Sequence, residues 1–303
     1  MEMYHNPVLL NECVEGLDIK ENGVYVDATL GGGGHAAEVA KRLKGGILIA
    51  FDQDVDALTN LKQENRNIKI IHANFRYMKR YLNEQGVTKV DGILADLGVS
   101  SHQIDTPGRG FSTRFNAPLD MRMDASSPVT AAEIVNTYPV ARLQKIFSAY
   151  GEIANSGTLA RIIGEARQHN KISTTGSLVV AIERCVPKQG SNKYLAKVFQ
   201  SLRIEVNGEI DALKDLLRQG RELLKEGGRL VIISYHSLED RVVKNYMRYG
   251  NFEGIPDKDI YGRDMCPFKP ITKKPLEPGE EEIEKNNRAR SAKLRIAEKT
   301  AVL

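Results

Sequence analysis

Four consecutive glycines, Gly31–Gly34, are the residues of this 303-residue chain whose type and spacing point most directly to chemistry. With His35 and Ala36 they form a GxGxxA pattern between an apolar run and a helical stretch. Glycines in a strand-to-helix turn let the backbone approach a ligand, and the start of the helix adds N–H donors. No Lys-Ser/Thr pair follows them, which disfavours a P-loop. The turn therefore predicts a site for a dinucleotide or for S-adenosyl-L-methionine (SAM).

Three aspartates near strand ends bear on that choice. Asp27 precedes the glycines, Asp52 follows them by about 20 residues, and Asp96 ends the apolar run "VDGILAD". Asp52 suits the ribose hydroxyls of either ligand. Asp27 favours SAM, because a carboxylate attracts the sulfonium and ammonium groups of SAM and repels a pyrophosphate. Capping of the turn is the alternative role for Asp27.

The elements that position these residues alternate in type. Apolar, β-branched runs predict strands at Val24–Ala28, Ile47–Phe51, Ile68–Ile71, Val90–Ala95 and Arg229–Ser234. Helical periodicity predicts helices at His35–Lys44, Val55–Gln63, Arg76–Asn83, Glu209–Lys225 and from Leu238. This alternation predicts βαβ crossovers, and hence a Rossmann-like, doubly wound α/β fold with a parallel sheet. Asp96 would lie at the switch edge of that sheet, where ligands bind.

A region of different composition separates the two groups of alternating strands and helices. A Gly-, Pro- and charge-rich stretch over 100–124 leads into helices predicted from Ser127, with Ser127 and Pro128 as N-cap and first helical residue. Further helices are predicted at Val140–Ala149, Ser156–His169, Thr175–Cys185 and Tyr194–Arg203. We therefore expect a SAM-binding domain of residues 1–103 and 208–303, interrupted by an all-helical insertion at 104–207.

The charge of the chain is concentrated in the insertion. Residues 104–207 contain 13 Lys+Arg and 8 Asp+Glu, a surplus of +5, whereas the whole chain is +4. A basic module beside a cofactor domain favours a polyanionic substrate, with ordinary surface solvation as the alternative.

Three widely spaced cysteines and six scattered histidines indicate no metal site. The absence of a signal peptide and of a long apolar run predicts a cytoplasmic protein that does not span a membrane.

The acceptor chemistry follows from Asp96 and the loop after it. Amino-methyltransferases hold a target nitrogen at such a fourth-strand acid, because the delocalised lone pair of an exocyclic amine must be aimed by hydrogen bonds. Carbon methylation of a pyrimidine needs a cysteine nucleophile, and none of the cysteines lies in a suitable loop. The stretch "LLKEGGRLVII" resembles the entry to a strand of class I methyltransferases. Nitrogen methylation is therefore the favoured chemistry.

Nine motifs in order give a family resemblance. They are "YHNPVLLNE" (4–12), "DATLGGGGHA" (27–36), "FDQD" (51–54), "DLGVSSHQ" (96–103), "GRGFS" (108–112), "PLDMRMD" (118–124), "FQSLRIEVNGE" (199–209), "SYHSLEDRVVK" (234–244) and "RARSAKLR" (288–295). On these motifs the chain resembles, nearly end to end, the RsmH (MraW) family of bacterial 16S ribosomal RNA cytosine-N4 methyltransferases. The resemblance implies SAM-dependent methylation of N4 of a cytidine in the decoding region of small-subunit ribosomal RNA, within a ribosomal particle.

The resemblance also assigns site residues. It implies that SAM is bound by Gly33, Gly34, His35, Asp52, Phe75, Asp96 and Gln103. For the chemistry we hypothesise in-line methyl transfer without a covalent intermediate or a metal, with Asp96, Asp120 and His236 as candidates to hold the amine. Candidates for phosphate contacts are Arg109, Arg114, Arg122, Lys188, Lys193 and Lys197. The competing interpretations are a nicotinamide dehydrogenase, a non-catalytic RNA-binding module and a methyltransferase with a protein or small-molecule acceptor.

Overall fold

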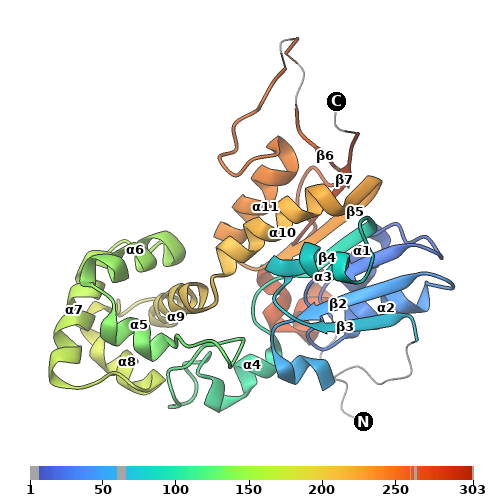
Figure 1. The fold of residues 1–303 in the computed structure, drawn as a ribbon. Helices are drawn as coiled ribbons and strands as arrows, with labels where there is room; N and C mark the ends of the chain where they lie inside the picture. The colour runs from blue at the N-terminus through green and yellow to red at the C-terminus, as the bar shows by residue number, and fades with distance from the viewer. Residues whose placement is uncertain (1–6, 60–65, 260, 263–264, 302–303) are drawn as a thin grey trace. The chain divides into compact units, whose positions relative to one another are not determined.

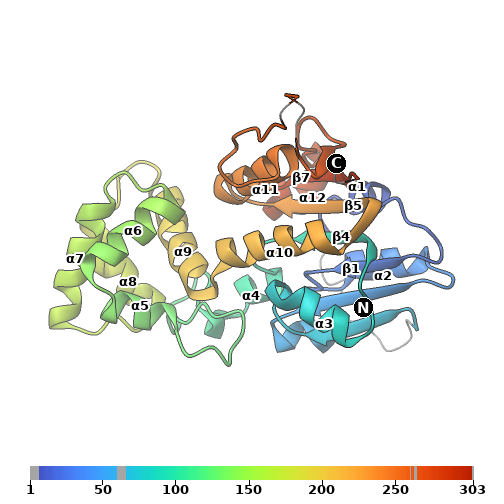
Figure 2. The same cartoon turned by 45° about the horizontal axis from the view of Figure 1, so that its top comes forward.

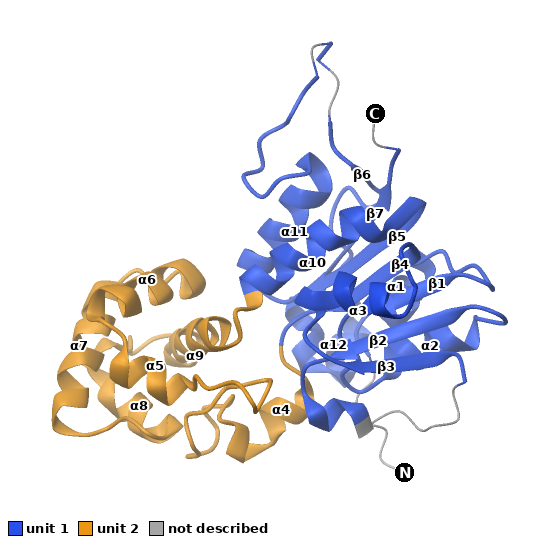
Figure 3. Ribbon diagram, viewed as in Figure 1, with its two compact units in different colours: residues 1–98, 210–303 blue, residues 99–209 orange. Residues whose placement is uncertain are grey.

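A computed structural model describes residues 7–59, 66–259, 261–262 and 265–301. The chain divides into two compact units (Figure 3): residues 1–98 with 210–303, and residues 99–209. The insertion expected at 104–207 lies within the second unit. Each unit has its own hydrophobic core.

The first unit is built on a seven-stranded sheet in the order β3-β2-β1-β4-β5-β7-β6. Its strands are β1 (Val24–Asp27), β2 (Ile47–Asp52), β3 (Ile68–His72), β4 (Val90–Asp96), β5 (Leu224–Ser234), β6 (Phe268–Pro270) and β7 (Lys293–Lys299). The parallel pairing expected for β1 to β5 is confirmed. The sheet as a whole is mixed, however, because β7 pairs antiparallel with both β5 and β6. The sequence analysis predicted no strand after Arg229–Ser234, and the C-terminal part of the chain supplies these two strands.

Helices cover both faces of this sheet (Figures 1 and 2). On one face, α1 (Leu10–Gly16) and α2 (Gly34–Lys41) pack against apolar residues of β4, β5 and β7. On the other, Gly220 of α10 (Glu209–Leu223) lies against Ile93 and Leu230. The remaining helical elements are η1 (Val55–Thr59), η2 (Phe75–Tyr77), α3 (Met78–Glu84), α11 (Ser237–Tyr249), α12 (Glu280–Lys285) and η5 (Asn287–Ser291). This is the expected doubly wound arrangement.

One predicted helix of this unit is only partly described. Periodicity predicts a helix over Val55–Gln63, and the structure has the 3₁₀ helix η1 over Val55–Thr59. Residues 60–63 lie outside the described residues. None of the helices within the described ranges has the length and apolar content needed to span a bilayer.

The second unit is helical. It contains α4 (Ser101–Asp105), η3 (Pro107–Arg109), α5 (Ala131–Thr137), α6 (Val140–Gly151), α7 (Ser156–His169), α8 (Thr175–Ala181), η4 (Glu183–Cys185) and α9 (Ser191–Asn207). The prediction of a helix start at Ser127 is wrong: α5 begins at Ala131, where the side chain of Thr130 accepts the Glu133 N–H. Arg122 Nη1 donates to the Ser127 carbonyl at 2.7 Å, which holds that segment as a loop.

Candidate active site

The carboxyl ends of the parallel strands meet at one edge of the first unit's sheet. Asp27, Asp52 and Asp96 are the last residues of β1, β2 and β4. In the strand register Asp27 pairs with Ala50 of β2 and Leu94 of β4, so Asp52 and Asp96 each lie two residues further along their strands at this edge. Ligands bind at this edge in open α/β sheets. The three aspartates singled out by the sequence therefore lie at the same edge.

The glycine turn has the backbone that glycine permits. Gly31 and Gly33 have φ of +49° and +76°, a region that other residues rarely adopt. The carboxylate of Asp52 accepts the Gly31 N–H at 2.9 Å and the Asp54 N–H at 2.9 Å. A carboxylate has about four acceptor positions, so Asp52 keeps capacity for ribose hydroxyls. Burial raises the pKa of Asp52.

His35 is the second residue of α2 and is buried, 6% exposed. Its Nε2 lies 3.0 Å from the Val8 carbonyl oxygen. A carbonyl only accepts, so Nε2 carries the proton and Nδ1 presents a lone pair. Nδ1 lies 4.0 Å from Oδ2 of Asp96. Because burial lowers the pKa of His35, the ring is neutral at neutral pH.

Asp96 is held at this edge through both its side chain and its backbone. Its Oδ1 accepts a hydrogen bond from the Tyr235 hydroxyl at 2.8 Å, and its backbone N–H donates to Thr29 Oγ1 at 2.7 Å. The pKa of Asp96 is raised to about 7. Burial is the main cause and the charge of Glu239 adds to it, whereas the Tyr235 hydrogen bond acts in the opposite direction. Asp96 therefore titrates close to neutral pH, as an acceptor or carrier of a proton at an active site must.

Asp27 caps the turn, which is one of the two roles that the sequence left open. Its Oδ1 accepts the Thr29 N–H at 3.0 Å, which caps the turn. Its Oδ2 is buried, and no described residue donates a hydrogen bond to it. Burial raises the pKa of Asp27 to about 6, and the nearby His35 lowers it. A buried carboxylate oxygen without a donor suits a cationic ligand group.

Tyr235 was not singled out by the sequence patterns. It follows Ser234, the last residue of β5, and so reaches the same edge as Asp96. That position after a strand is the signal from which it could have been found.

The neighbouring candidate, His236, is the N-cap of α11: its Nδ1 accepts the Glu239 N–H at 3.3 Å. This bond favours a capping role for His236. Phe75 is half-buried at the start of η2, just beyond β3.

In the second unit Asp120 and Arg122 form a closed pair. Arg122 Nε and Nη2 donate to the two carboxylate oxygens of Asp120 at 2.8 and 2.7 Å. Arg122 Nη1 also donates to the carbonyls of Ala125 and Ser127. Burial raises the pKa of Asp120, but the Arg122 hydrogen bonds outweigh it and hold that pKa below its usual range. These contacts favour a structural role for both residues.

The other candidates of the second unit differ in exposure. Arg109 is half-buried and donates to the carbonyls of Arg122 and Met123. The side chain of Gln103 accepts the Ser100 N–H in the capping box of α4. Lys197 is half-buried, whereas three candidates are exposed: Arg114, Lys188 and Lys193. The exposed cations are the ones available to a phosphate backbone.

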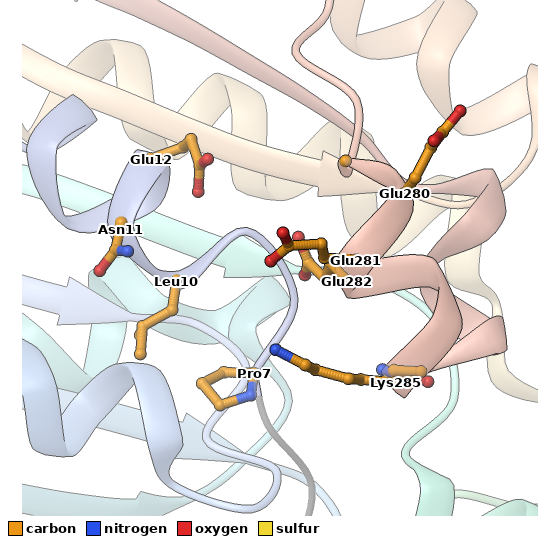
Figure 4. Close-up of a pocket in the computed structure, with 10 residues that line it drawn as sticks. Pro7, Leu10, Asn11, Glu12, Glu280, Glu281, Glu282 and Lys285 are labelled. Atoms are coloured by element: carbon orange, nitrogen blue, oxygen red, sulfur yellow. The ribbon is translucent and has the colours of Figure 1, made fainter.

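A pocket of about 610 Å³ in the first unit lies between α1 and α12 (Figure 4). Its walls include Glu12 and three consecutive glutamates, Glu280–Glu282, opposed by Lys285. This excess of carboxylates disfavours phosphate groups. None of the predicted SAM-binding residues lines it. Glu282 accepts the Leu9 N–H at 2.8 Å, while the Val8 carbonyl accepts from His35, so the N-terminal segment separates this pocket from the His35 ring.

Comparisons with known proteins identify the family. The profile of the MraW methylase family matches residues 2–300. Ribosomal RNA small subunit methyltransferase H of Cytophaga hutchinsonii is 56% identical over 298 residues, covering 98% of this chain and 100% of that protein. The protein of the same name from Flavobacterium johnsoniae is 54% identical over 297 residues, covering 98% of each.

Among solved structures, an rRNA methylase from Streptococcus thermophilus matches 96% of this chain and 94% of its own, with 15% identity and a TM-score of 0.39. The sequence match is far closer: it runs through both units, and identity to full-length relatives exceeds half. On that ground the chain belongs to the MraW methylase family.

Proposed function

We propose that this enzyme transfers the methyl group of SAM to the exocyclic N4 of a cytidine in the decoding region of 16S ribosomal RNA, in the cytoplasm. The family is one of methylases, and the name of the relatives specifies small-subunit ribosomal RNA. The observation that supports the nitrogen target is Asp96, a half-buried carboxylate bound by Tyr235 at the switch edge. A fixed acceptor at that edge is what an exocyclic amine needs.

The residues at this edge fit SAM. Gly32 has open space where a Cβ would stand, and Asp27 has a buried oxygen without a donor. When bound, SAM supplies an electrophilic methyl group on a positively charged sulfur. Gly33, Gly34 and His35 would form the floor under it. Asp27 would offset its positive charge, Asp52 would accept from the ribose, and Phe75 would cover the adenine.

Asp96 would act on the target amine. Its Oδ2 is not used by Tyr235 and can accept a hydrogen bond from the cytosine NH₂, which fixes the direction of the nitrogen lone pair. The nitrogen becomes acidic once methylated. A carboxylate with a pKa of about 7 can take the released proton at neutral pH. A stronger base is not required, and no cysteine nucleophile is needed for attack by nitrogen.

The insertion would bind the RNA. Its exposed cations Arg114, Lys188 and Lys193 suit phosphate contacts, which give affinity without reading sequence. The target cytidine must leave its stack to reach the half-buried carboxylate of Asp96. Binding through these cations predicts an affinity for small-subunit RNA that falls steeply with salt concentration.

Mapping of N4-methylcytidine tests the function. Small-subunit RNA from cells that lack the protein should lack one N4-methylcytidine in the decoding region. Restoring the wild-type gene, but not the Asp96→Asn gene, should return it. Asp91→Asn, at the opposite end of β4, is the matched control and should restore the modification. An unchanged modification in the deletion strain would refute the proposal.

Calorimetry separates the competing interpretations. The purified protein should bind SAM and not NAD, whereas a dehydrogenase would show the reverse. SAM binding without methyl transfer to any small-subunit RNA would favour a non-catalytic RNA-binding module. Transfer to protein or small molecules alone would favour a different acceptor.

A further inference from the structure

The ring of Tyr235 is fixed independently of its hydroxyl. It packs against the apolar core shared by α1, α2 and the sheet. It also lies beside Gly98, two residues beyond the end of β4: a Cβ on Gly98 would stand 3.6 Å from Tyr235 Cδ2. The backbone N–H of Tyr235 donates to Oε2 of Glu239 at 2.9 Å. The phenol oxygen is therefore held in place by packing on the ring and by a bond to the backbone.

The Tyr235 hydroxyl binds one of the two carboxylate oxygens of Asp96. It donates to Oδ1 at 2.8 Å, while Oδ2 faces Nδ1 of His35 at 4.0 Å. Nδ1 presents a lone pair when Nε2 is bonded to the Val8 carbonyl. A neutral His35 therefore offers Oδ2 no proton. Among the residues that the structure describes, Tyr235 is the side chain that donates a hydrogen bond to this carboxylate, and it leaves Oδ2 as the acceptor for a substrate.

The other ionisable groups around Asp96 either disfavour its ionised form, because they carry negative charge, or are neutral. Glu239 of α11 raises the pKa of Asp96. The charge of Asp96 in turn raises the pKa of Asp27 at the end of β1 and of Cys13 in α1. His35 of α2 is neutral at neutral pH because burial lowers its pKa. The Tyr235 hydrogen bond is the contact that favours the ionised form of Asp96.

We propose that Tyr235 is a positioning residue for the methyl-transfer reaction: its hydroxyl aims the Asp96 carboxylate and keeps it ionised so that Oδ2 accepts from the target amine. This rests on the proposed function of Asp96. It assigns to Tyr235 an effect that depends on pH, because the hydroxyl acts on the ionised form of its partner.

Tyr235→Phe tests the proposal, since it removes the hydroxyl and keeps the ring. Loss of a hydrogen bond to a charged group should move the acidic limb of the kcat/KM profile up by about one pH unit. Activity should then fall about tenfold at pH 6 and stay within about twofold of wild type at pH 9. Tyr246→Phe is the matched control, a buried tyrosine in α11 whose hydroxyl interacts with Arg221, and should leave the profile unchanged.

A substitution in the opposite direction gives an independent readout. Tyr235→3-fluorotyrosine carries a more acidic hydroxyl, which donates a stronger hydrogen bond and should move the acidic limb to lower pH. An acidic limb identical to wild type in both variants, or an equal shift in Tyr246→Phe, would overturn the proposal.

A titration without substrate separates this inference from the proposed function. The ¹³C carboxyl resonance of Asp96, assigned through Asp96→Asn, should titrate about one pH unit higher in Tyr235→Phe than in wild type. An unshifted titration overturns the role of Tyr235 even if the enzyme methylates cytidine. A shifted titration in an enzyme that makes no N4-methylcytidine would support the Tyr235–Asp96 coupling and refute the function assigned to it.

Discussion

Strand β4 carries an aspartate near each end, Asp91 at the amino edge of the sheet and Asp96 at the carboxyl edge. The side chain of Asp91 is 7% exposed and that of Asp96 is 25% exposed. Asp91 accepts from Lys225 Nζ at 2.7 Å and from the Val24 N–H at 2.9 Å. Burial raises the pKa of Asp91, but these bonds outweigh it and hold that pKa below its usual range.

Asp96 has a neutral phenol and a neutral imidazole as neighbours instead of an ammonium group, and its pKa rises to about 7. The same residue type on the same strand thus forms an ion pair with Lys225 at one edge and has no cationic partner among the described residues at the other. The difference lies in whether a cation is part of the fold or must arrive with a ligand.

The largest expected effect is on catalysis. Asp96→Asn should lower kcat/KM for small-subunit RNA by roughly 10²–10⁴-fold, because the amide loses the charge and the proton-accepting capacity of the carboxylate. Asp91→Asn should stay within about twofold of wild type. Single-turnover methylation with radiolabelled SAM measures both. Equal losses in the two variants would remove the distinction between the edges.

The second effect concerns stability: the Asp96→Asn substitution that lowers activity should raise the free energy of unfolding. The pKa of Asp96 is about 7 in the fold and lower in the unfolded chain, so the folded protein binds an extra proton and loses stability as pH rises toward 7. Asp96→Asn should therefore be more stable than wild type by roughly 2–4 kcal/mol at pH 8 and by much less at pH 5. Urea unfolding followed by circular dichroism at both pH values measures this. A variant that is destabilised at pH 8 would show that the charge of Asp96 is compensated in the fold.

A third prediction concerns the cofactor. Asp27→Asn should weaken SAM binding by roughly 10- to 100-fold, because a buried charged partner is replaced by a neutral one. Affinity for S-adenosylhomocysteine, which lacks the sulfonium charge, should change less. Isothermal calorimetry with the two ligands gives the ratio. The same loss for both ligands would point to the turn-capping bond with Thr29 and not to charge.

The smallest effect is expected at the amino edge. Asp91→Asn should cost roughly 1–2 kcal/mol of stability at pH 7, since the Lys225 bond loses its charge. The pKa of Asp91 is depressed in the fold, so its contribution is present above its unfolded pKa and is lost as pH falls through its folded value. Wild type and variant should converge in acid, as thermal unfolding between pH 3 and 7 will reveal. A gap that persists in acid would assign the loss to the Val24 contact.

Local patterns predicted much of the fold. The five parallel strands lie where apolar runs were found, because a buried strand must be apolar along its own length. Strand β7 was missed: its sequence "KLRIAEK" is dominated by charge, and Arg295 is accommodated in the sheet because Asp240 accepts two hydrogen bonds from it. A buried ion pair cannot be recognised from one partner alone.

The site residues likewise divide into those that local sequence patterns predicted and those whose role depends on contacts in the fold. The glycine turn, Asp27, Asp52 and Asp96 follow from their order relative to the strands, and the structure brings their strand ends to one edge. Asp120 looked equivalent in the sequence, yet its charge is offset by Arg122 two residues away. The roles of these residues in binding and catalysis remain predictions for the experiments above.

By itself the sequence determined where the chain could turn closely around a ligand and which acids would end the strands, because glycine freedom and strand periodicity are properties of neighbours in the chain. Only the tertiary structure decided what each acid can do. Tyr235 is 139 residues from Asp96, and Lys225 is 134 residues from Asp91. A pKa depends on burial and on the groups in contact, and folding alone brings such distant groups together.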